Sequence, residues 1–144
     1  MNDTEQLVEI IGEIAREVAA KRGAFDLFAL FARDVEAPWD VIVSSEWAAR
    51  NRRAATGEVA ALLQSRLPLN QIVTLAGIVV LDPNDPAVLA ARRLAQSGPP
   101  RFRDAEFERL SVAQGIVLAW TAPPATAPAA TLPRTRRQAE KAAA

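Results

Sequence analysis

The sequence predicts an α+β domain in which helices cover a mixed sheet of four or five strands. The chain opens with apolar residues at helical spacing, and two short apolar stretches then flank an acidic turn, as in a strand pair. A later apolar run stands between two helical stretches, which favours a third strand parallel to one of the first two. At 144 residues the chain has the length of a single domain. The expected order is helix, two strands, one or two helices, strand, helix and two strands.

The first helix is predicted over Asp3–Arg22. Its apolar residues recur every three or four positions and form one stripe, which contains Leu7, Ile11, Ile14 and Val18. Four glutamates occupy the opposite side, which we expect to face solvent. Gly23 follows two basic residues, and this pattern is typical of a helix C-terminus.

A strand hairpin is predicted next. Phe25–Arg33 is apolar on both faces, which favours a central strand that is covered twice. Asp34–Pro38 has the composition of a turn, and Trp39–Ser45 alternates like a second strand. Because the connection is so short, the two strands are expected to run antiparallel.

A long helix is predicted from a cap at Ser44 or Ser45 to about Leu67, where Pro68 stops it. The segment Pro68–Leu75 leaves two possibilities open, a helical turn that begins at Pro68 or the start of a long strand. Gly77 favours a break, so the third strand is predicted at about Ala76–Asp82.

Asp85 followed by Pro86 is the pattern of a helix start, and a helix is predicted to about Gln96. The last folded part is predicted as a hairpin of Glu106–Val112 and Ile116–Thr121, with its turn at Gln114-Gly115. A single strand over Leu110–Trp120 is the alternative.

The composition changes at Ala122. Residues 122–144 are rich in Pro and Ala and contain one large apolar residue, so we expect a disordered tail behind a domain formed by residues 1–121. The tail carries four basic residues and one acidic residue, a net charge of +3. Because the whole chain is neutral, residues 1–121 carry a net charge of −3.

The composition excludes several classes of enzyme. The chain contains no Cys, His or Tyr, which rules out a Ser-His-Asp triad, a Cys-His protease and a zinc hydrolase. Only carboxylate, Lys, Arg or hydroxyl chemistry remains for an enzyme. No cofactor is expected, because a Gly-rich phosphate loop is missing and because Glu46 would repel an anion at the start of the long helix.

The sequence also predicts a cytoplasmic protein without membrane contact. No apolar run approaches the length of about 18 residues that a membrane span needs. The N-terminus, MNDTEQ, is acidic and polar, whereas a signal peptide begins with a basic region and an apolar one.

One candidate site lies where the hairpin meets the long helix. Asp26 and Glu46 are expected near each other beside two serines, and such a group could hold Mg²⁺. The plainer interpretation is that Asp26 opens a strand, that Ser44 or Ser45 caps the helix, and that Glu46 complements the helix dipole. If Asp40 also joined them, the site would suit a divalent-metal-dependent enzyme or a nuclease-like domain.

Two further stretches are candidates for interaction. The first, AARNRRAA, places Arg50 and Arg53 on the long helix, but the acidic body argues against nucleic acid as a partner. The second, RFRDAEFER, is charged and contains two aromatic residues that we expect to be exposed. Exposed aromatic residues mark interfaces, and the candidates in this stretch are Arg101, Phe102, Arg103 and Phe107.

The stretch WDVIVSSEWA, followed by a long helix and then by GIVVLDPNDPAV, resembles a group of small uncharacterised bacterial proteins. These have a strand of the form WD-aliphatic-VVS-x-x-W ahead of a helix. The resemblance covers most of Ala24–Thr121 and implies no activity, so it carries no functional residues to this chain.

The leading functional hypothesis is a non-enzymatic interaction or regulatory module that docks a protein partner or self-associates. It depends mainly on the missing catalytic residues. The alternative is the divalent-metal-dependent enzyme or nuclease-like domain that uses Asp26, Asp40 and Glu46, and it requires these carboxylates to converge.

Overall fold

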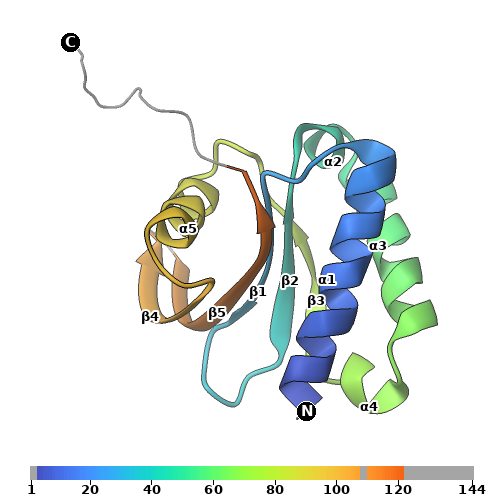
Figure 1. Cartoon of the computed structure of the whole chain (residues 1–144), viewed down its shortest axis with the longest axis horizontal. Helices are drawn as coiled ribbons and strands as arrows, with labels where there is room; N and C mark the ends of the chain where they lie inside the picture. The colour runs from blue at the N-terminus through green and yellow to red at the C-terminus, as the bar shows by residue number, and fades with distance from the viewer. Residues whose placement is uncertain (1–2, 108–109, 122–144) are drawn as a thin grey trace.

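A computed structural model of the chain describes residues 3–107 and 110–121 (Figure 1). It confirms the predicted α+β class, with one mixed five-stranded sheet. The predicted tail lies outside the described residues. The strands are β1 (Leu27–Ala32), β2 (Trp39–Ser44), β3 (Leu75–Val80), β4 (Arg101–Phe107) and β5 (Leu110–Trp120).

The spatial order of the strands is β3-β2-β1-β5-β4. Only β2 and β3 pair in parallel, and the other pairs are antiparallel. β1 is central and fully buried, as its two apolar faces predict. The predicted hairpin is also confirmed, with Leu27 opposite Ser44 and Phe31 opposite Asp40.

Helices lie on both faces of the sheet (Figure 1). One face carries α1 (Asp3–Arg22) and α3 (Arg52–Arg66), and its buried core contains Ile11, Ile14, Phe28, Leu30, Val59 and Leu63. The apolar stripe predicted for the first helix is therefore the side that packs on the sheet. The opposite face carries α5 (Pro86–Ser97), which packs mainly against β1, β4 and β5.

The helix predicted from Ser45 to Leu67 is wrong as a single element. It is divided into α2 (Glu46–Arg50) and α3 by Asn51, whose backbone is not helical. Each part has its own side-chain cap, because Ala48 N donates to Ser45 Oγ at 3.2 Å and Ala54 N donates to Asn51 Oδ1 at 3.1 Å. Asn is a strong N-cap residue, and here that preference overrides the helical pattern.

The segment after Pro68 is helical, which decides between the two possibilities left open by the sequence. It forms the short helix α4 (Leu69–Ile72), and β3 begins three residues later at Leu75. None of the helices among residues 3–107 and 110–121 is long and apolar enough to cross a membrane.

The two strands predicted at the end of the domain are present as the antiparallel pair β4 and β5, but their predicted bounds and turn are wrong. Gln114 and Gly115 form no turn, since β5 runs through them and pairs with β1 and β4 on its two sides. The single strand over Leu110–Trp120, which was the alternative, is the one observed. Gly115 is needed inside the strand because the ring of Phe102 occupies the space where a Cβ atom would lie.

Candidate functional site

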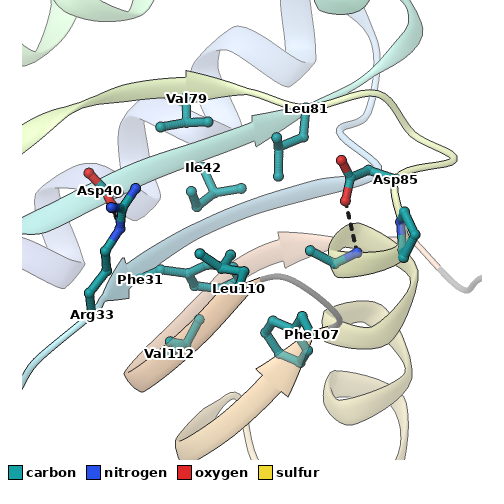
Figure 2. A pocket seen from close by; sticks show the side chains of 12 residues that line it. Phe31, Arg33, Asp40, Ile42, Val79, Leu81, Asp85, Phe107, Leu110 and Val112 are labelled. Atoms are coloured by element: carbon teal, nitrogen blue, oxygen red, sulfur yellow. Dashed lines mark hydrogen bonds and ion pairs between the residues drawn. The ribbon is translucent and has the colours of Figure 1, made fainter.

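A cavity of about 370 Å³ opens on the sheet face that carries α5 (Figure 2). Its walls come from all five strands and from the start of α5. Most of the lining is apolar, and the side chains that Figure 2 shows around the cavity include Phe31, Ile42, Val79, Leu81, Leu110 and Val112. The volume lies in the range of sites that bind small ligands or anchoring side chains.

The cavity exists because one helix is too narrow for this face. Five strands about 4.8 Å apart span about 20 Å, whereas a helix with its side chains is about 10 Å wide. Since α5 packs mainly on β1, β4 and β5, the apolar residues of β3 on this face are left beside it with less cover. Val79 and Leu81 are accordingly only half-buried.

Charged groups stand at two ends of the cavity. Arg33 Nε lies 3.7 Å from Asp40 Oδ2, and the Arg33 side chain is 72% exposed while that of Asp40 is 18% exposed. At the other end, Asp85 accepts a hydrogen bond of 2.8 Å from Ala87 N and so caps α5. Two carboxylates against one guanidinium make the rim of the cavity net negative.

An aromatic cluster borders the cavity. The ring centroid of Phe102 lies 5.7 Å from that of Phe31 and 5.6 Å from that of Phe107, both in edge-on geometry. Phe102 is half-buried and Phe107 is 5% exposed, so the expectation that both are exposed is wrong. Their use as interaction residues stays a prediction.

The burial of both rings has a cause in the backbone of β4. Residues five apart point to opposite faces of a regular strand, yet Phe102 and Phe107 belong to the same core cluster. Between them, Asp104 has a φ of 53°, and the pairing of β4 with β5 skips this residue. This irregularity turns both aromatic side chains toward α5.

Asp26 and Asp40, two of the three carboxylates that the metal-dependent alternative uses, are placed apart. Asp40 and Asp26 lie at opposite ends of the antiparallel hairpin, because Asp40 faces Phe31 and Asp26 precedes Leu27. Glu46 is exposed in the first turn of α2, where the plainer interpretation puts it, and it lies 3.7 Å from Arg50. Ser45 caps α2, as that interpretation predicts.

In the part of the chain that the structure describes, no group of three or more acidic, His or Cys side chains is placed to hold a metal ion. The convergence of Asp26, Asp40 and Glu46 that the metal-dependent alternative requires is therefore not found there.

Asp26 takes part in a partly buried polar contact instead. Its Oδ1 lies 3.8 Å from Arg92 Nη2 and accepts a hydrogen bond of 3.4 Å from Thr121 Oγ1. Arg92 is 4% exposed and donates from Nε to Thr121 O at 2.8 Å. Burial lowers the pKa of Arg92. The negative charge of Asp26 raises this pKa in part, and the positive charge of Arg93 lowers it further. The contact joins α5 to the start of β1 and the end of β5.

The arginines predicted as interaction residues have different surroundings. Arg50 and Arg53 are both exposed, and Arg50 lies 3.7 Å from Glu46. Arg52, between them in the sequence, donates from Nη1 to the carbonyl oxygen of Val80 at the end of β3. Arg101 and Arg103 are exposed on β4.

Sequence reasoning missed the cavity as a site, although it singled out Asp40 and Phe107 from its lining. A signal was present: three main helices were predicted for a sheet of up to five strands, so one face had to be left with a single helix. Which strands that helix leaves open depends on its packing angle, which the sequence pattern does not specify.

No protein-family model matches the sequence, and a search of the curated proteins found no match. A function for this chain is therefore inferred from its own geometry.

Proposed function

We propose that this chain is a non-enzymatic interaction module that receives an apolar side chain of a protein partner in the cavity beside α5. The observation that carries the proposal is the apolar lining of that cavity on an incompletely covered sheet face. An anchoring side chain that fills such a pocket is the usual centre of a protein interface.

The polar groups at the cavity support binding rather than catalysis. Asp85 is engaged as the cap of α5, and Asp40 is paired with Arg33. The chain as a whole contains no His, Cys or Tyr. An enzyme at this cavity would have to work with Arg33 and two carboxylates at opposite ends.

Charge favours a partner segment in which a basic residue stands next to the apolar anchor. The two carboxylates at the rim outnumber Arg33, and residues 1–121 carry a net charge of −3. Arg33 is mostly exposed and makes a long contact with Asp40, so a basic group of a partner could share that carboxylate.

The first test is the uptake of a neutral apolar dye, Nile red, by the full chain. We expect its fluorescence to rise with the wild type and with Leu94→Trp, which is an exposed position on α5 outside this cavity. Leu81→Trp should abolish the rise, because the larger side chain fills the cavity from its half-buried wall. Circular dichroism of both variants establishes that they are folded.

The second test selects binders from a library of random displayed peptides. Peptides with an apolar residue beside Lys or Arg should be enriched, and they should lose binding to Leu81→Trp while keeping it for Leu94→Trp. If the dye enters and no peptide is enriched, the cavity is a small-molecule site and the interaction proposal fails. Peptides that bind both variants equally would contradict the cavity as the docking place.

A further inference from the structure

The two edges of the sheet differ in their protection against pairing with another chain. β4, at one edge, carries charged residues along its length and is interrupted by the positive φ of Asp104. β3, at the other edge, has the sequence LAGIVV, with no charge and no proline. Charges and irregular backbone are the usual means of keeping an edge strand unpaired. β3 lacks charges, and its one register shift, between Leu75 and Gly77, lies at its N-terminal end and leaves residues 77–80 in regular pairing with β2.

β3 turns part of its backbone away from β2, toward its outer edge. Leu81 N donates to Val43 O at 2.9 Å, and because directions alternate along a strand, Val80 and Ile78 turn their N–H and C=O groups outward. The carbonyl of Val80 is taken by Arg52 Nη1, which closes the C-terminal end of the edge. No described strand pairs with the outer side of Ile78.

Two large apolar side chains are exposed just before this strand in the sequence. Leu69 and Val73 are 75% and 68% exposed, the highest values among the large apolar side chains of the described residues. They are four residues apart at α4, just upstream of β3, so they share one side of that turn. Ala76 and Gly77 in the strand itself are also exposed.

We propose that β3 pairs with β3 of a second copy of this chain, antiparallel about a two-fold axis at Ile78. The outward N–H and C=O groups of Ile78 then form hydrogen bonds with those of Ile78 in the second copy, and the two five-stranded sheets join into one. The occupant is a second copy because an uncharged strand pairs with itself without like-charge repulsion, and a two-fold axis makes the same surface serve both partners.

β3 also contributes Val79 to the cavity wall. The proposed pairing uses the outward backbone groups of Ile78, so the inference does not depend on a partner binding in the cavity. Gly77, at the centre of the edge, is exposed and has open space where a Cβ atom would lie. A lysine at this position therefore fits the monomer, but in the dimer it would place a charge against the apolar strand of the second copy.

The test measures the mass of the full chain by size-exclusion chromatography with light scattering, from micromolar to submillimolar concentration. We expect the wild type to approach twice the chain mass as concentration rises. Gly77→Lys should stay monomeric over the range. Gly57→Lys is the matched control, since Gly57 is exposed on α3 with open space around it, and it should associate like the wild type.

Hydrogen exchange read by mass spectrometry locates the contact. Amides of β3 should become more protected at high concentration in the wild type and in Gly57→Lys, and amides of β4 should not change. A monomer at every concentration overturns the proposal. So does a dimer that Gly77→Lys leaves intact, or one that protects β4 instead of β3.

Discussion

The ring of Phe102 on β4 lies over Gly115, the residue opposite it on β5. A Cβ atom on Gly115 would come well inside contact distance of three ring carbons of Phe102. The same ring packs edge-on against Phe31 and Phe107. Gly115 is thus a packing requirement of the aromatic cluster, because nothing larger than hydrogen fits beneath the ring.

Gly115→Ala is expected to destabilise the domain by about 2 kcal/mol, because the ring of Phe102 must leave its place in the aromatic cluster. Urea unfolding followed by circular dichroism measures the change. In a Phe102→Ala background the same substitution should be nearly neutral, since the space above Gly115 is then open. Equal losses in both backgrounds would show that the ring is not the cause.

Asn51→Ala is expected to lower the free energy of unfolding by about 1 kcal/mol, because Ala54 N loses its side-chain acceptor at the start of α3. Thermal and urea unfolding report the effect. Asn70→Ala, at an exposed position on α4, is the control and should change stability little. Should the two variants behave alike, Asn51 is not acting as a cap.

Arg92→Met is expected to cost about 2 kcal/mol, because the carbonyl oxygen of Thr121 loses a charged donor in a buried place. Methionine keeps most of the apolar length of the side chain, so the decrease in the free energy of unfolding measures the contribution of the guanidinium group. Arg93→Met changes the exposed neighbour and serves as the control.

The contribution of Asp26 to this contact can be separated by a double-mutant cycle. Asp26→Ala should destabilise the wild type more than it destabilises Arg92→Met, because the carboxylate has a buried guanidinium beside it only in the former. Additive losses would mean that Asp26 and Arg92 act independently, despite their proximity.

The elements with a clear hydrophobic period were predictable from the sequence. The apolar stripe of α1 predicts a helix packed on one side, and the two apolar faces of β1 predict a buried central strand. Both are found in the structure. Asn51 was missed because a cap inside a helical pattern differs from an exposed helix residue only through its backbone, which depends on packing.

The region after residue 100 was harder to predict for a related reason. The charges around Phe102 and Phe107 indicated exposure, but they belong to an edge strand whose irregularity at Asp104 turns both rings inward. Gly115 was interpreted as a turn because a glycine inside a strand is ordinarily unfavourable. The neighbouring ring that requires it is thirteen residues away in the sequence and adjacent only in the fold.

The central place of β1 has a consequence for how the chain is synthesised. β2 is synthesised directly after β1, but the other neighbour of β1 in the sheet is β5. The contact between Asp26 and Thr121 accordingly joins residues that are 95 positions apart. Until β5 has been translated, the middle of the future sheet is an open apolar edge. Chains that stop short of β5 are therefore expected to aggregate rather than to form a smaller stable domain, so a nonsense change late in the message would be as damaging as an early one.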